Sequence, residues 1–131
     1  MRLLLDTHIW IWSDLEPWRL TSDVTRILSD TENELWLSPI SVWELIVHLE
    51  KKRITLEKDV LTWIAASKQE LSLREAPMSW AVAEELRFVV LRHRDPADRF
   101  LVATARVQDL TLVTADRTLM EIDGVRILPN C

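Results

Sequence analysis

The sequence predicts an α/β fold in which helices cover both faces of a parallel β-sheet. Short apolar runs typical of buried strands alternate along the chain with longer segments of helical periodicity. Two of these helical segments open with a capping residue followed by proline, which is a strong start signal. The length of 131 residues, with 48% hydrophobic residues, suits one domain over residues 1–131.

The first quarter of the chain is expected to hold two strands and one helix. Arg2–Leu5 is a short apolar run suited to a buried strand, and it ends at Asp6. A polar segment is expected next, followed by a helix over residues 22–30 with a hydroxyl residue as its N-cap. Leu35–Leu37 is the second expected strand.

Two helices are expected in the middle of the chain. Ser38-Pro39 places a cap before a first-turn proline, and the helix it opens ends in the basic run Lys51-Lys52-Arg53. We expect that basic run to be a solvated helix terminus. The second helix, over residues 57–70, carries its apolar residues on one face.

The last half of the chain continues the alternation. Leu71–Arg74 is a possible third strand, and Ser79 is expected to cap a helix whose Val90 faces inward. Asp95-Pro96 repeats the signal of a cap followed by proline. The remaining expected elements are a helix over residues 97–107, a strand at Thr111–Thr114, a short helix over residues 116–121 and a strand at Val125–Leu128.

Composition excludes several classes of protein. Gly124 is the only glycine, so neither a P-loop nor a dinucleotide-binding fingerprint is possible. A single cysteine and the lack of a long uncharged run favour a cytoplasmic protein that is neither secreted nor embedded in a membrane. The net charge of −5 argues against a passive nucleic-acid binder, but a nuclease that holds cations between carboxylates escapes this objection.

Tryptophan is unusually frequent, with seven residues and no tyrosine. Trp43 lies in an apolar stretch and is expected in the core. Trp10, Trp12 and Trp18 share one segment that could pack on a partner protein, a second copy of the chain or an RNA base. Ordinary internal packing is the simpler expectation for each of them.

Acidic residues follow two of the expected strands. Asp6 comes directly after the first strand, and Asp116 lies two residues beyond the strand at Thr111–Thr114. Functional groups gather at the carboxyl ends of parallel strands, so the two are expected to be close, although each could simply cap the helix behind it. Glu44 lies in the most apolar part of its helix, where a carboxylate needs a cation, a salt bridge or a turn outward.

A third group of acids surrounds the start of the helix at residue 97. Asp95 is placed to cap this helix, whereas Asp98 lies in its first turn, either available for chemistry or reaching back to the cap. Separated acids that meet at one sheet edge form an oxygen-rich pocket for Mg²⁺ or Mn²⁺, which suits phosphodiester hydrolysis. The histidines His8, His48 and His93 are scattered and are expected to be solvated or structural.

Five arginines fall close together in the sequence around Asp98. They could contact phosphates, or they could form a salt-bridged surface with the acids interleaved among them. They are Arg87, Arg92, Arg94, Arg99 and Arg106.

Four sequence blocks resemble the PIN-domain nucleases, and most closely the VapC-type toxins of prokaryotic toxin–antitoxin pairs. They lie in family order and are LLLDTHIWIW at Leu3–Trp12, SPISVWEL at Ser38–Leu45, HRDPADRFLVATA at His93–Ala105 and LVTAD at Leu112–Asp116.

The resemblance implies a three-layer α/β/α sandwich and cleavage of RNA through a metal-activated water. It makes Asp6, Glu44, Asp98 and Asp116 the catalytic, metal-binding acids for Mg²⁺ or Mn²⁺. Family toxins commonly form a homodimer and are silenced by a cognate antitoxin that covers the active site. The expected supporting residues are Thr7, Ser41, Thr114 and Arg99.

Two alternatives share the same four acids. One is a catalytically idle PIN-like module that serves in binding or assembly, against which the intact set of acids speaks. The other is a DNA-directed nuclease, because metal-dependent hydrolysis needs the phosphate and not the 2′-hydroxyl.

Overall fold

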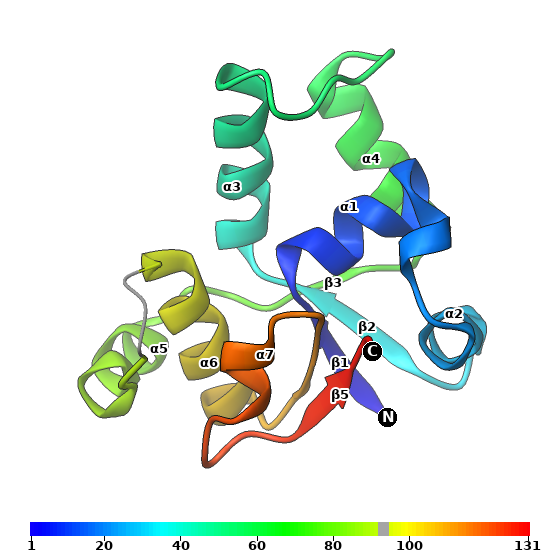
Figure 1. Ribbon diagram of the computed structural model, residues 1–131. Coiled ribbons are helices and arrows are strands. Elements are labelled where there is room, and N and C mark those ends of the chain that lie inside the picture. Colours follow the sequence, from blue (N-terminus) through cyan, green and yellow to red (C-terminus); the bar gives the residue numbers. More distant parts are fainter. Residues whose placement is uncertain (92–94) are drawn as a thin grey trace.

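The computed structural model describes residues 1–91 and 95–131 (Figure 1). Within these residues, five strands form one sheet in the order β3-β2-β1-β4-β5, and all neighbours are parallel. The predicted α/β class with a parallel sheet is therefore confirmed. The strands are β1 (Arg2–Leu5), β2 (Glu34–Leu37), β3 (Arg74–Glu75), β4 (Thr111–Thr114) and β5 (Ile127–Pro129).

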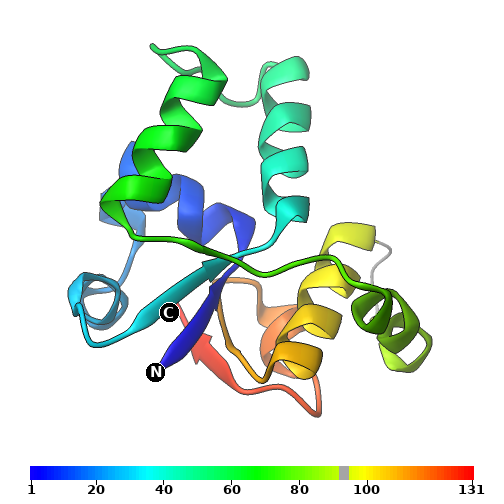
Figure 2. The ribbon, with the colours of Figure 1, turned by 180° about the vertical axis from the view of Figure 1, so that it is seen from behind.

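Helices cover both faces of the sheet, which gives the three layers that the resemblance implied (Figures 1 and 2). One layer contains α1 (Thr7–Leu15), α2 (Ser22–Ser29), α3 (Pro39–Glu50) and α4 (Val60–Glu70). The other contains α5 (Trp80–Glu85), α6 (Pro96–Gln108) and α7 (Arg117–Met120). Two short 3₁₀ helices, η1 (Pro17–Arg19) and η2 (Leu86–Phe88), extend α1 and α5.

The two layers have separate apolar cores because side chains alternate along each strand. In β1, the side chains of Leu3 and Leu5 pack with the first layer, while Leu4 packs with the second. All three leucines are completely buried. The central strand is thus covered on both sides, as its continuous apolar sequence predicts.

Helix α1 occupies the segment that was expected to be polar and irregular. Ile9, Trp10 and Ile11 are consecutive and all buried, so this helix lacks the one-sided apolar stripe by which an amphipathic helix is recognised. The expectation was wrong because α1 is enclosed between the sheet and its neighbouring helices, and a helix that is buried on most sides has no clear period in its sequence.

Several boundaries also differ from expectation. Helix α4 begins at Val60 instead of residue 57, because the side chain of Asp59 accepts a hydrogen bond from the Leu61 amide at 3.1 Å. The third strand starts at Arg74, since α4 runs on to Glu70 and Ser72 has a left-handed backbone with φ of 49°.

Strand β5 begins two residues later and ends one residue later than expected, over Ile127–Pro129 at the edge of the sheet, where a proline is tolerated. Val90 was expected to face inward but is 84% exposed, because the helical region that begins with α5 ends at Phe88.

The prediction for Trp43 was wrong, since this side chain is 51% exposed. The fully buried positions of α3 are Ser41 and Leu45, and Trp43 lies about 200° around the helix from each of them. Trp10 is completely buried, as ordinary packing predicts, whereas Trp18 is 74% exposed.

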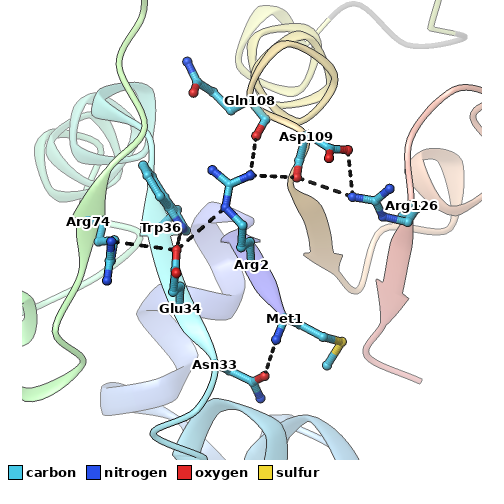
Figure 3. Close-up of polar contacts among 9 residues, drawn as sticks. All are labelled: Met1, Arg2, Asn33, Glu34, Trp36, Arg74, Gln108, Asp109 and Arg126. Carbon is cyan, nitrogen blue, oxygen red and sulfur yellow. Dashed lines mark hydrogen bonds and ion pairs between the residues drawn. The ribbon is translucent and has the colours of Figure 1, made fainter.

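Three arginines form polar contacts along the side of the sheet where the parallel strands begin (Figure 3). Arg2 donates to the backbone carbonyls of Gln108 and Asp109 and lies 3.7 Å from the carboxylate of Glu34. Arg74 lies 3.8 Å from that same carboxylate, and Arg126 pairs with Asp109 at 2.8 Å. Each of these arginines is paired with a carboxylate of the chain, so their role at this edge of the sheet is structural.

The described helices include none that combines the length and the apolar character needed to cross a membrane.

Candidate active site

The topology places a crevice at the carboxyl ends of β1 and β4. Strand β1 lies between β2 and β4, and the connections that leave the carboxyl ends of β1 and β4 run to opposite faces of the sheet, to α1 and to α7. A pocket of about 300 Å³ opens at this point. All four of the predicted acids line it, together with Asp95, and the lining residues are Asp6, His8, Trp12, Glu44, Asp95, Asp98, Ala115 and Asp116.

Asp6 follows the last residue of β1 and is only 6% exposed. Its carboxylate accepts a hydrogen bond of 2.6 Å from the Thr114 hydroxyl and makes no capping bond to α1. Burial raises the pKa of Asp6, and the charge of Asp116 adds to this effect, while the Thr114 bond and the charge of His8 oppose it. Asp6 is thus a buried acid that lines the pocket, and its orientation is fixed by the hydrogen bond from Thr114 of β4.

Asp116 is joined to Asp6 through the same threonine. Its backbone amide donates to the Thr114 hydroxyl oxygen at 3.0 Å, and its side chain accepts from the Thr118 amide at 2.9 Å to cap α7. The cap and the pocket position are therefore compatible, and the Thr114 hydroxyl is hydrogen-bonded to both Asp6 and Asp116.

Glu44 comes from α3 and is held by α1. The Thr7 hydroxyl donates to the Glu44 carboxylate and lies 2.8 Å from the Ser41 hydroxyl. Because a hydroxyl has one proton, Ser41 donates to Thr7 when Glu44 is ionised. Burial raises the pKa of Glu44 to about 7, and the negative charges of Asp95, Asp6 and Asp98 contribute to the rise.

Helix α6 contributes two acids to the pocket. Asp95 caps the helix as predicted, accepting from the Ala97 amide at 3.0 Å. Asp98 lies in the first turn and is 7% exposed. Asp95 was expected only to cap the helix, but its carboxylate also lines the pocket. Its negative charge contributes to the raised pKa of Glu44.

Two aromatic residues of α1 also line the pocket. His8 and Trp12 are one helical turn apart, with ring centroids 5.7 Å apart, and His8 also contacts His48 of α3 at 5.5 Å. His8 is exposed, as expected, yet it lies at the site. Its place was missed because α1 was missed, since a helix starting at Thr7 would have put both residues on one face. The prediction for His93 lies outside the described residues.

The described arginines near Asp98 contact other residues of the chain and do not line the pocket. Arg99 donates to the Leu86 carbonyl at 2.8 Å, and Arg106 lies 3.5 Å from the carboxylate of Glu85. Arg87 lies over the ring of Phe88, at 4.4 Å from its centroid. The predictions for Arg92 and Arg94 fall outside the part of the chain that the structure describes.

The chemistry of the pocket fits a hard divalent cation. Its acidic side chains offer carboxylate oxygens, the ligands that Mg²⁺ and Mn²⁺ prefer. Burial raises the pKa values of Asp6 and Glu44, and the negative charges of neighbouring acids raise them further, so a cation would relieve this repulsion. Among residues 1–91 and 95–131, no group of three His, Cys, Asp or Glu side chains stands close enough together to hold a metal ion.

Comparison with known proteins identifies the family. The PIN domain model matches residues 3–125. Ribonuclease VapC22 of Mycobacterium tuberculosis is 34% identical over 120 residues, which cover 89% of this chain and 88% of that protein.

Solved structures share the fold. A chain of DNA-bound VapBC from Salmonella typhimurium matches with a TM-score of 0.70 at 22% identity, covering 100% of this chain and 99% of that one. A chain of FitAcB from Neisseria gonorrhoeae matches with a TM-score of 0.63 at 24% identity, covering 98% and 97%. The match of the family model over nearly the whole chain, together with the VapC22 relative, establishes that this chain belongs to the PIN domain family.

Proposed function

We propose that this chain is a metal-dependent endoribonuclease and the toxin of a toxin–antitoxin pair. The observation that carries the proposal is the convergence of Asp6, Glu44, Asp98 and Asp116 on one pocket. These acids come from distant parts of the sequence and from both helical layers. Their negative charges repel one another, and a cation bound among them would offset this repulsion. The ribonuclease name of the VapC22 relative supports RNA as the substrate.

The four acids would hold Mg²⁺ or Mn²⁺, which, when bound, supplies an activated water and stabilises charge on the phosphate. The Thr114 hydroxyl donates a hydrogen bond to the Asp6 carboxylate and accepts one from the Asp116 amide, so it fixes the spacing of these two acids. Thr7 and Ser41 orient Glu44 in the same way. Asp98 is held in the first turn of α6, where the helix dipole stabilises an anion.

The toxin part of the proposal rests on the relatives. The matched structures from Salmonella typhimurium and Klebsiella pneumoniae are described as VapBC and as a toxin–antitoxin complex. By this likeness, an antitoxin protein is the expected partner of the present chain. Homodimer formation and a cytoplasmic location stay predictions from the sequence.

The test is cleavage of a structured RNA and of DNA with the matching sequence, in Mg²⁺, Mn²⁺ or EDTA. We expect cleavage of RNA that requires metal and falls at least about 100-fold in Asp6→Asn and in Asp98→Asn. Asp123→Asn is the matched control, because it removes an exposed carboxylate that does not line the pocket.

Each alternative has its own result. Cleavage of DNA in preference to RNA would make the chain a DNA-directed nuclease. Metal binding without cleavage of either substrate would favour an idle PIN-like module. Activity that survives in Asp6→Asn and Asp98→Asn would show that the site is assigned wrongly.

A further inference from the structure

Helix α3 connects the acidic pocket to an exposed cluster of cations. Glu44 lies in the pocket, His48 is one helical turn further along, and Lys51 follows the end of the helix. At a rise of about 1.5 Å per residue, Lys51 is about 10 Å along the helix axis from Glu44. Figures 1 and 2 show α3 rising from the end of β2 with this end pointing away from the sheet.

Two histidines lie between the pocket and the cations. His8 lines the pocket, and its ring lies 5.5 Å from that of His48. Burial lowers the pKa of His48, the charges of His8, Arg53 and Lys51 lower it further, and the charge of Asp95 raises it. His48 therefore lies where the acidic pocket and the cationic end of α3 meet.

The cationic end has a defined backbone. Lys52 adopts the left-handed conformation with φ of 56°, and the Arg53 amide donates to the His48 carbonyl at 2.9 Å. This pattern is the hydrogen-bonded C-terminal turn that closes many helices. It places Lys51, Lys52 and Arg53 on a fixed turn instead of a loose tail.

These three cations differ from the arginines of the opposite sheet edge. In the described part of the chain, Lys51, Lys52 and Arg53 are exposed and form no ion pair, whereas Arg2, Arg74 and Arg126 are each paired with a carboxylate (Figure 3). The helix dipole alone favours cations at this end. It does not account for three adjacent unpaired cations beside the pocket of a chain whose net charge is −5.

We propose that Lys51, Lys52 and Arg53 bind phosphates of the RNA strand that flank the scissile phosphate. This inference rests on the proposed ribonuclease function and adds to it a site for substrate binding. An acidic pocket repels the polyanion that it must cleave, and cations about 10 Å away on a fixed turn attract the neighbouring phosphates without entering the pocket. Their contribution is to affinity and orientation, not to the chemical step.

The test compares two triple variants that each remove three exposed cations. One is Lys51→Ala/Lys52→Ala/Arg53→Ala, and the control is Arg26→Ala/Lys68→Ala/Arg126→Ala, whose positions lie on α2, on α4 and just before β5. Binding of a fluorescent single-stranded RNA is measured by anisotropy in EDTA over a range of salt. Cleavage of a long RNA and of a dinucleotide, which has only the scissile phosphate, is measured with metal.

We expect the α3 variant to bind RNA about tenfold more weakly than the control variant at low salt. The slope of log affinity against log salt should be shallower by about 2, at about 0.7 for each lost phosphate contact. KM for the long RNA should rise at unchanged kcat, and cleavage of the dinucleotide should not change.

Equal losses of affinity in the two triple variants would overturn the inference, because net charge alone would then explain them. So would equal effects of the α3 variant on the long RNA and on the dinucleotide. A wild-type chain that cleaves no RNA would instead refute the proposed function on which the inference rests.

Discussion

Asp95 immediately precedes α6 and Asp98 lies in its first turn, and both line the pocket. Asp95 accepts the Ala97 amide as an N-cap, and asparagine serves as well as aspartate in that position. We expect Asp95→Ala to lower the free energy of unfolding by about 1 kcal/mol and Asp95→Asn to leave it nearly unchanged. Asp95→Asn should also keep most of the RNA cleavage that Asp98→Asn loses.

Urea denaturation and RNA cleavage, measured on the same preparations, check this prediction. A loss of activity in Asp95→Asn as large as that in Asp98→Asn would give Asp95 a direct part in metal or substrate binding.

Glu44 makes the stability of the metal-free protein depend on pH. Its pKa is raised to about 7, chiefly by burial, from the ordinary 4.5, so the folded state favours the protonated form. The stabilisation from that proton is complete below pH 4.5 and is lost as pH rises through 7. In EDTA, the wild type should match Glu44→Gln at about pH 4 and be less stable at about pH 8.

The expected difference at pH 8 is about 1 to 2 kcal/mol, less than the full pKa shift implies, because Glu44 is partly solvated. Thermal melting of both proteins across this range measures it, and the variant corrects for every other titrating group. A stability difference between the two proteins that does not change with pH would show that ionisation of Glu44 does not destabilise the fold.

At the scale of elements, two indole rings join α1 to α4. Trp10 of α1 donates to the Ser67 hydroxyl at 2.8 Å, and Trp63 of α4 donates to the Asp14 carboxylate at 2.7 Å. The two rings lie 5.1 Å apart. We expect Trp10→Ala to cost about 3 to 5 kcal/mol of unfolding free energy, whereas Trp18→Ala, at an exposed position, should cost less than about 0.5 kcal/mol.

Circular dichroism in urea is the suitable measurement, because both variants change the fluorescence. Similar losses in the two variants would mean that α1 does not depend on the contact with α4.

The elements that the sequence predicts best are those with local signals. Ser38 and Asp95 both cap helices that continue with proline, and the helices begin within one residue of the expected position. Strand ends followed by acids also place Asp6 and Asp116 correctly at one pocket. Helix α1 could not be found in this way, because burial on several sides removes the periodicity, and the pocket positions of His8 and Trp12 were lost with it.

The place of a side chain between elements is harder to predict. The cap signal of Asp95 is local, but its approach to Glu44 depends on how α6 meets α3. Arg99 follows Asp98 directly, yet it extends to the Leu86 carbonyl and not to the pocket. Sequence neighbours diverge here because adjacent helix residues point about 100° apart.

At the scale of the whole molecule, the pocket exists only when both layers are assembled. Its four proposed ligands extend from residue 6 to residue 116, so an ion bound to them binds the folded chain and not the unfolded one. Saturation at 100 times the Kd then adds about 2.7 kcal/mol to the free energy of unfolding. We expect Mg²⁺ or Mn²⁺ to raise the Tm of the wild type and of Asp123→Asn in a concentration-dependent way, and to leave the Asp6→Asn/Asp98→Asn double variant near its value in EDTA. Melting at constant ionic strength separates this effect from general screening, and an equal rise in all three proteins would place the metal outside the pocket.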